Sequence, residues 1–379
     1  MHVLVLGAGL LGVSSAWHLR AAGHDVTLLD RQPGPGLETS FANGGHISVC
    51  HAEPWATPQA PLQALRWLGK EDAPLLFRLR WDPQLFDWSL RFLRQCTPGR
   101  TRANIRAIVN LALYSRARLQ ALRRELQASN ELSYDHLERG ILHIHCNDRE
   151  YAAASHAAAL MREFGLDRQM VNVDTCLRLE PALASSRHLL VGGDWTPSDE
   201  SGDAHRFTQQ LAAAAVRRGV STCYRQRIDR LLVEGGKTVG AVVQPLDEND
   251  RPAGPPQEIR ADATVIALGS YTPLLLRPLG LNIPIYPAKG YSATLPLGPD
   301  SIAPTVSLTD DSHKIVISRL GQRLRIAGTA EFNGYNRDLT PARCQMLQRR
   351  VDQLFPNLRP TGPAEYWTGL RPPRPPTSP

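Results

Sequence analysis

The N-terminal stretch 3–12 constrains the fold more strongly than any other part of this sequence. Its first four residues, Val-Leu-Val-Leu, have the length and composition of a buried parallel strand. They lead directly into a Gly-x-Gly-x-x-Gly pattern formed by Gly7, Gly9 and Gly12. In this pattern the first glycine allows a tight turn, the second lets a pyrophosphate approach the backbone, and the third lets a helix pack closely on the strand.

The residues that follow complete a dinucleotide-binding unit. The segment 13–22 has a helical pattern that ends at Gly23, and its N-terminus would present N–H groups and a positive dipole end to phosphates. A second strand, 25–29, is followed by Asp30, where an acid can accept a hydrogen bond from a ribose hydroxyl. The pattern predicts bound NAD or FAD, and a tight turn without a ligand is the alternative interpretation.

Later segments extend this unit into a doubly wound α/β sheet. The run 261–270 is a small apolar strand ending in glycine, and we expect it to return beside the first strand. Short β segments are expected at 222–224, 228–234 and 239–243. A second β-rich block predicts an antiparallel sheet in a separate α+β domain. Its strands are expected at 283–297, 313–319 and 323–330.

The two domains are expected to interleave along the chain. The Rossmann-like nucleotide domain is discontinuous and takes 1–55 and 195–278, and the α+β substrate domain takes 56–194 and 279–371. Leu62, Leu65 and Leu68 recur at helical spacing and predict a short helix that wraps the second domain. The tail 372–379 holds five prolines in eight residues and cannot form a strand or a helix.

Cysteine and histidine spacing predicts no metal site. The six cysteines have no Cys-x-x-Cys spacing, which favours buried free thiols over a metal site or a disulfide framework. His143 and His145 share one face of a strand at 140–145, a geometry that a metal could use. Because no third ligand stands nearby in the sequence, we favour a half-exposed strand face.

Positive charge is concentrated in a basic block, 78–124, where eleven arginines accompany only Asp82 and Asp87. A solvated helical surface is the simplest interpretation, and a long helix is expected at 103–126. A patch that meets anionic lipid or an acidic partner is the functional interpretation. No nucleic-acid-binding module accompanies the charge, so we expect no nucleic-acid partner. No apolar run could span a bilayer and no signal peptide precedes the first strand, so we expect a cytoplasmic protein.

Five further motifs carry a family resemblance. They are Glu38-Thr39-Ser40-x-Ala42-Asn43-x-Gly45, Gly193-x-x-x-Pro197-x-Asp199-Glu200-x-Gly202-Asp203, Gly269-Ser270-Tyr271, Pro287-x-Lys289-Gly290-Tyr291-Ser292 and Gly369-Leu370-Arg371-Pro372. With the glycine pattern, they make residues 1–372 resemble the FAD-dependent superfamily of D-amino-acid oxidases and glycine oxidases, and within it the small subunits of bacterial D-amino acid dehydrogenases. The resemblance selects FAD over NAD.

The resemblance also implies which residues bind the cofactor. The three glycines would lie on the FAD pyrophosphate, Asp30 on the adenosine ribose, and 39–45 along the pyrophosphate and flavin. Ile228 matches a position whose backbone meets adenine, and Gly269 would close the site. The full expected set is Val3, Val5, Gly7, Ala8, Gly9, Leu10, Leu11, Gly12, Asp30, Arg31, Thr39, Ser40, Asn43, Gly44, Gly45, Ile228 and Gly269.

The implied reaction is oxidation of a D-amino acid such as D-alanine, by hydride transfer from Cα to FAD, with hydrolysis to a 2-oxo acid and ammonia. Arg371 matches the arginine that pairs with the substrate carboxylate, a task that suits its planar fork. Tyr291 is expected to form a wall of the pocket. Electrons would pass to a membrane electron-transfer acceptor, and the basic block would hold the protein on the cytoplasmic face of a bacterial inner membrane.

Two other functions remain open: an oxygen-using amino-acid or amine oxidase, and a catalytically inactive flavoprotein remnant. Related chains continue past Gly-Leu-Arg-Pro with Thr-Pro-Asp-Gly and several dozen further residues that close over the flavin. We therefore interpret this chain as truncated, with 372–379 read out of frame, and expect weak FAD binding and poor turnover.

Overall fold

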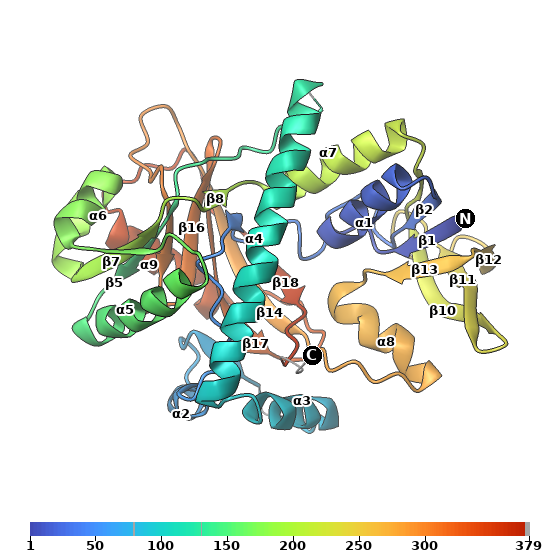
Figure 1. The fold of residues 1–379 in the computed structure, drawn as a ribbon, viewed down its shortest axis with the longest axis horizontal. Helices are drawn as coiled ribbons and strands as arrows, with labels where there is room; N and C mark the ends of the chain where they lie inside the picture. The colour runs from blue at the N-terminus through green and yellow to red at the C-terminus, as the bar shows by residue number, and fades with distance from the viewer. Residues whose placement is uncertain (79, 130, 376–379) are drawn as a thin grey trace. The chain divides into compact units, whose positions relative to one another are not determined.

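The computed structural model describes residues 1–78, 80–129 and 131–375, which fold as two compact units (Figure 1). Unit 1 comprises Met1–Phe41, Glu125–Tyr134 and Ala204–Ile285; unit 2 comprises Ala42–Arg124, Asp135–Asp203 and the residues from Tyr286 onward. Segments 42–55 and 195–203, which we expected in the nucleotide domain, thus pack within unit 2. Of the proline-rich tail, 376–379 lies outside the described residues.

Unit 1 is built on a four-stranded parallel sheet in the order β13-β1-β2-β9. Its strands are β1 (His2–Leu6), β2 (Asp25–Leu29), β9 (Ser221–Cys223) and β13 (Ala263–Ile266). As the sequence predicted, β13 pairs in parallel with β1, with Val5 opposite Val265. Side chains on both faces of β1 are apolar and buried, which is the condition under which parallel strands are stable.

The two faces of this sheet have different partners. Helix α1 (Leu10–Ala21) packs on β1, β2 and α7 (Ala204–Arg217). Leu4 and Leu6, which point to one face because they are two residues apart, share a core with Leu231 and Val243. The latter two belong to an antiparallel sheet of β10 (Gln226–Glu234), β11 (Lys237–Pro245) and β12 (Gln257–Arg260). Helix α8 (Thr272–Leu276) contributes to the same core.

Unit 2 contains a mixed nine-stranded sheet in the order β18-β14-β17-β16-β15-β5-β7-β6, with β4 paired to β17. The strands are β4 (Leu75–Phe77), β5 (Ile141–His145), β6 (Gln169–Val171), β7 (Gly192–Thr196), β14 (Ala288–Pro296), β15 (Ser307–Asp310), β16 (Ile315–Leu320), β17 (Arg323–Phe332) and β18 (Glu365–Arg371). The strand predicted at 283–297 begins only at Ala288, because Pro284 and Pro287 have no N–H group for strand pairing.

Helices pack on this sheet and around it. They are α2 (Ala60–Trp67), α3 (Pro83–Leu93), α5 (Asp148–Glu163), α6 (Val173–Leu179) and α9 (Pro341–Leu354). A 3-10 turn at Pro181–Leu189 also belongs to unit 2, whereas those at Gly269–Tyr271 and Arg277–Leu279 belong to unit 1. Helix α5 contacts β5, β6 and β7, while α9 contacts β14 and β17. The short strands β3 (His46–Ile47) and β8 (Glu200–Ser201) form a separate antiparallel pair.

The helices between 60 and 128 depart from expectation. The predicted short helix is present in unit 2 as α2. All eight of its residues are described and none is buried, so its leucines do not pack into the core of that unit as expected. The long helix, α4 (Pro98–Ala128), extends beyond the predicted range at both ends. Its stripe buries Ile105 and Leu122 but leaves Leu111 69% exposed. Within the part of the chain that the structure describes, no helix has the length and apolar character needed to cross a membrane.

Candidate functional site

The three glycines of the turn in unit 1 differ in how much space surrounds them. Gly7 has a φ of +105°, and a Cβ added there would lie 2.5 Å from the carbonyl oxygen of Ala267. At Gly12 an added Cβ would lie 1.7 Å from the carbonyl oxygen of Gly7, so only glycine lets α1 start against the turn. At Gly9 the same test gives an ordinary 3.7 Å contact with Ser40 Oγ. The turn is therefore tight at both ends and open at its middle, as a diphosphate-binding loop requires.

The N-terminus of α1 can receive an anion. Gly9, its N-cap, has no side chain to occupy the free N–H groups, and the first turn carries no acidic residue. Leu10 N–H donates to Ser40 Oγ at 3.1 Å, which places a hydroxyl beside the turn, and Leu11 is 75% exposed. The backbone N–H groups and the positive end of the helix dipole both favour negative charge here.

Asp30 is held in place by the turn that it follows. Its carboxylate accepts hydrogen bonds from Ala8 N–H at 2.6 Å and from Gln32 N–H at 2.8 Å. Burial raises the pKa of Asp30, while these two hydrogen bonds lower it. The carboxylate is thereby oriented at the carboxyl end of β2, where a ribose hydroxyl could donate to it.

The other expected unit 1 residues surround this point. Arg31 Nη2 donates to Glu38 Oε1 at 2.6 Å, and the Arg31 guanidinium lies 4.2 Å above the Tyr271 ring. Gln226 N–H donates to the Asp30 carbonyl at 2.9 Å, which ties the start of β10, and so Ile228, to the end of β2. Gly269 follows β13 with a φ of +53°.

Two of the expected cofactor residues have buried side chains. The side chains of Val3 and Val5 are 2% and 0% exposed, so they pack in the core of unit 1. These side chains help to fix β1, which positions the turn, so any contact with a cofactor would come from the backbone.

In unit 2, the run that begins at Asn43 is an ordered backbone segment laid against the large sheet. Asn43 Oδ1 accepts from Gly45 N–H at 3.0 Å, and Arg325 Nη1 donates to the Asn43 carbonyl at 3.1 Å. Ser318 Oγ donates to the Gly44 carbonyl at 2.7 Å. A Cβ added at Gly44 would lie 2.4 Å from Val316 Cγ2, so a larger residue would force the Val316 side chain or the backbone to shift.

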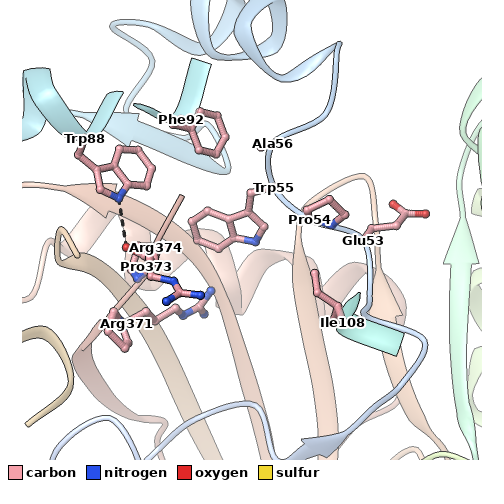
Figure 2. Close-up of a pocket in the computed structure, with 11 residues that line it drawn as sticks. Glu53, Pro54, Trp55, Ala56, Trp88, Phe92, Ile108, Arg371, Pro373 and Arg374 are labelled. Atoms are coloured by element: carbon pink, nitrogen blue, oxygen red, sulfur yellow. Dashed lines mark hydrogen bonds between the residues drawn. The ribbon is translucent and has the colours of Figure 1, made fainter. Parts of the chain in front are cut away.

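A cavity of about 360 Å³ in unit 2 contains the expected substrate arginine (Figure 2). Its lining residues are Glu53, Pro54, Trp55, Ala56, Trp88, Phe92, Ile108, Arg371, Pro372, Pro373 and Arg374. One side is shaped by Trp88, whose Nε1 donates to the Pro373 carbonyl at 3.1 Å. Aromatic side chains and two arginines therefore face a common space.

Arg371 lacks a protein partner in this cavity. It ends β18 opposite Ala288, and its guanidinium crosses Gly290, where a Cβ would lie 2.8 Å from Nε. No hydrogen bond or ion pair reaches its side chain from residues 1–78, 80–129 or 131–375. Burial lowers the pKa of Arg371, because the charged guanidinium is destabilised where it has neither water nor a counter-ion. An anion that entered the cavity would relieve this cost.

Tyr291 does not line that cavity, contrary to our expectation of a pocket wall. It is 1% exposed, and its hydroxyl donates to Glu331 Oε2 at 2.5 Å. Burial and the hydrogen bond to Glu331 raise the pKa of Tyr291. Lys289 Nζ lies 3.3 Å from the same carboxylate oxygen, so the tyrosine belongs to a buried polar cluster of β14 and β17.

The histidines of β5 are also placed differently from the prediction. His143 and His145 are 3% and 1% exposed, so the expectation of a half-exposed strand face is wrong. The strand lies between β15 and β7, inside the large sheet. Cys50 and His51 lie beside His143, and these three could hold a metal ion. Their separation in sequence explains why no local spacing revealed the group.

Several arginines of the basic block form ion pairs, so the block carries less unpaired surface charge than its sequence suggests. Arg116 pairs with Asp199 at 2.9 Å, Arg102 pairs with Glu163 at 2.8 Å, and buried Arg123 pairs with Glu200. These acids lie outside the block, so the sequence excess overstated the surface charge. Arg94, Arg106, Arg118 and Arg124 are exposed.

Comparison with known proteins agrees with these features. Residues 2–379 match the FAD dependent oxidoreductase family. The chain is 60% identical over 375 residues to a D-amino acid dehydrogenase of Dechloromonas aromatica, covering 99% of this chain and 87% of that protein. It is 48% identical over 380 residues to a protein of the same name from Paramagnetospirillum magneticum, covering 100% and 86%.

Solved structures share the fold. Glycine oxidase from Geobacillus kaustophilus superposes with a TM-score of 0.71 at 20% identity, covering 98% of this chain and 82% of that one. L-alpha-glycerophosphate oxidase from Mycoplasma pneumoniae, solved with FAD bound, superposes with a TM-score of 0.63 at 17% identity, covering 98% and 83%. The expected resemblance, the choice of FAD and the α/β fold class are therefore confirmed, and the chain belongs to the FAD dependent oxidoreductase family.

Proposed function

We propose that this protein is a D-amino acid dehydrogenase that converts small D-amino acids, such as D-alanine, to 2-oxo acids and ammonia. Relatives at 60% and 48% identity carry that name. The structural observation that carries the proposal is the Arg371 guanidinium, which faces a largely apolar cavity and has no partner among the described residues.

Unit 1 would hold the nucleotide end of FAD. The open middle of the glycine turn and the N-terminus of α1 fit the diphosphate, and the Asp30 carboxylate fits a ribose hydroxyl. FAD, when bound, supplies the acceptor for the hydride from the substrate Cα. The Ala8–Asp30 hydrogen bond links the glycine turn to the carboxylate at the end of β2.

Arg371 would hold the substrate carboxylate. Its planar fork can donate two parallel hydrogen bonds, which fixes the orientation of the amino acid as well as its position. Trp55, Trp88 and Phe92 would contact the substrate side chain and exclude water. The cavity lies near the small end of the range of about 300–1,000 Å³ for ligand pockets, which favours small substrates.

The test compares Arg371→Met and Arg371→Lys with Arg374→Met, which changes the other arginine of the same cavity. Flavin reduction by D-alanine and by L-alanine is followed anaerobically at the flavin absorbance band. Loss of the bidentate pair, worth about 3–4 kcal/mol, should lower kcat/KM by about 10²–10³-fold in Arg371→Met. Arg371→Lys should recover little of this loss. Arg374→Met should lower kcat/KM much less than Arg371→Met, because the Arg374 side chain is exposed to solvent.

Two results would overturn the assignment. Equal reduction rates in Arg371→Met and the unchanged protein would remove Arg371 from the site. Flavin that binds but is reduced by no D-amino acid would favour the inactive flavoprotein remnant.

The proposed electron acceptor is a component of a membrane electron-transfer chain. The competing function is an oxidase that uses oxygen directly. Turnover with a soluble quinone analogue under argon supports the dehydrogenase, whereas hydrogen peroxide formed in proportion to D-alanine consumed supports the oxidase.

Peripheral contact with an anionic membrane is proposed on the side of α3. Phe86, Leu90 and Leu93 lie on one face of this helix and are 74%, 41% and 49% exposed, and the preceding Trp81 is 94% exposed. Exposed Arg94 follows directly, and exposed Arg106 lies on α4. Apolar and aromatic side chains next to arginine are the composition of a helix that rests in a bilayer interface.

A further inference from the structure

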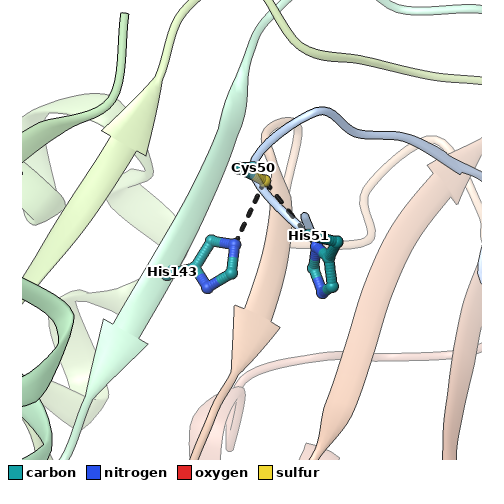
Figure 3. Close-up of side chains that lie close together, drawn as sticks. All are labelled: Cys50, His51 and His143. Carbon is teal, nitrogen blue, oxygen red and sulfur yellow. Dashed lines mark hydrogen bonds between the residues drawn. The ribbon is translucent and has the colours of Figure 1, made fainter. Parts of the chain in front are cut away.

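Three potential metal ligands meet in unit 2, and none of them is among the residues assigned above to FAD or to the substrate. Cys50 Sγ lies 3.2 Å from His143 Nε2 and 3.6 Å from His51 Nδ1. Dashed lines mark these two contacts in Figure 3. The three ligand atoms all lie within 4.8 Å of one another. Cys50 and His51 belong to the loop after β3, whereas His143 projects from β5.

The distances fit tetrahedral coordination. With zinc–sulfur and zinc–nitrogen bonds of about 2.3 and 2.05 Å, a tetrahedral ion needs its sulfur and nitrogen ligands about 3.6 Å apart. The two Cys50 distances, 3.2 and 3.6 Å, are close to this value. The two imidazole nitrogens need a separation of about 3.3 Å, and the ligand atoms of His51 and His143 lie within 4.8 Å of each other.

His143 is already oriented as a ligand. Its Nδ1 lies 2.7 Å from Asp311 Oδ2. A neutral imidazole that donates its Nδ1–H to this carboxylate presents Nε2 toward Cys50 as an acceptor. A carboxylate behind an imidazole is the usual outer partner of a metal-binding histidine, since it fixes the tautomer and strengthens the ligand.

The backbone of Cys50 is also fixed in advance. The Asp199 carboxylate accepts from Val49 N–H and Cys50 N–H, each at 2.9 Å. Arg168 Nη1 donates to the Cys50 carbonyl at 3.4 Å. The loop therefore presents its thiol at one place, and an ion would need little rearrangement of the protein to bind.

We propose that Cys50, His51 and His143 form a binding site for a borderline divalent cation of the zinc class, with Asp311 as the outer partner. One thiolate and two imidazoles suit zinc, and three protein ligands leave the fourth position for water or another small ligand. A Cys-His-Asp nucleophilic triad would use the same geometry, but Cys50 is 1% exposed, which denies access to an organic substrate.

The experiment uses the full chain loaded with FAD. Stripped protein is titrated with Co²⁺, and difference spectra follow the d–d bands of tetrahedral cobalt and the thiolate-to-cobalt charge-transfer band. Zn²⁺ is then added to displace the cobalt, and bound zinc per chain is measured by elemental analysis. The variants are Cys50→Ser, His143→Gln and Asp311→Asn, with Cys176→Ser as the control because Cys176 is an equally buried thiol outside the group.

We expect one equivalent of Co²⁺ per chain in the unchanged protein and in Cys176→Ser, with a charge-transfer band that Cys50→Ser abolishes. Asp311→Asn should weaken the affinity about 10- to 100-fold. Absence of a tetrahedral cobalt spectrum in the unchanged protein overturns the proposal without reference to any variant, as does a charge-transfer band that survives in folded Cys50→Ser.

Discussion

At the scale of single residues, close backbone approach is the strictest requirement of this protein. Gly12 and Gly44 each lie where a methyl group would enter an occupied volume, against the Gly7 carbonyl in one unit and Val316 in the other. Neither glycine has a positive φ, so conformation alone would admit alanine at both positions. Space, rather than φ, therefore decides the residue type.

Gly12→Ala should abolish FAD binding and lower the free energy of unfolding by about 1–3 kcal/mol, because the carbonyl of Gly7 must move to admit the methyl group. The ratio of flavin to protein absorbance and urea unfolding measure the two effects.

Gly99→Ala is the matched control. Gly99 lies in α4, where an added Cβ would meet no atom of the described chain within 4 Å. We expect unchanged flavin content and a gain of about 0.5–1 kcal/mol in stability. A Gly12→Ala protein with normal flavin content would show that the turn tolerates a shifted carbonyl.

At the scale of elements, buried charge joins β14 to β17. Glu331 is 1% exposed and meets Tyr291, Lys289 and Arg78. Burial alone would raise the pKa of Glu331, but the hydrogen bonds from Tyr291 and Arg78 and the charge of Lys289 lower it. A lowered folded-state pKa stabilises the fold above the unfolded-state pKa of 4.5 and loses that effect as the pH falls through the folded value.

Glu331→Gln should therefore cost about 3–5 kcal/mol at pH 7, because it leaves Lys289 buried without a counter-charge. The difference from the unchanged protein should shrink as the pH is lowered below 4.5, and urea unfolding at several pH values measures it. Asp300→Asn, at an exposed loop position of the same unit, should change stability by less than about 0.5 kcal/mol. A pH-independent difference for Glu331→Gln would contradict the linkage argument.

At the scale of the whole molecule, the net charge of +7 gives weak attraction to anionic surfaces, and its distribution decides where that attraction acts. Several arginines of the basic block are committed to internal ion pairs, such as Arg116 with Asp199 and Arg123 with Glu200. The arginines left on the surface of the block are those that a lipid headgroup can reach.

Replacing five exposed arginines of the block by glutamine should abolish binding to vesicles that contain anionic lipid, measured by co-sedimentation at low salt. They are Arg94, Arg100, Arg106, Arg118 and Arg124. The control replaces five exposed arginines elsewhere and removes the same charge. They are Arg149, Arg178, Arg187, Arg230 and Arg251. Equal binding of both variants would assign the block to the solvated surface.

The sequence by itself determined the turn of unit 1 and its immediate surroundings. The strand before Gly7, the helix after it, Asp30 and the return of β13 beside β1 were all predicted, with helix α1 beginning three residues earlier than expected. These features depend on short spacings and on backbone sterics, which act between residues near in sequence. Motif resemblance likewise identified FAD and the family.

Only the tertiary structure decided what is buried and what is paired. Cys50 meets His143 across 93 residues, His143 is enclosed by the neighbouring strands, and Arg371 is left without a partner beside a cavity. The order of strands in the large sheet brings these groups together, and it is set by the packing of the whole of unit 2. The burial and the charge partners of a side chain depend on neighbours that are distant in sequence, so a local sequence pattern cannot predict them.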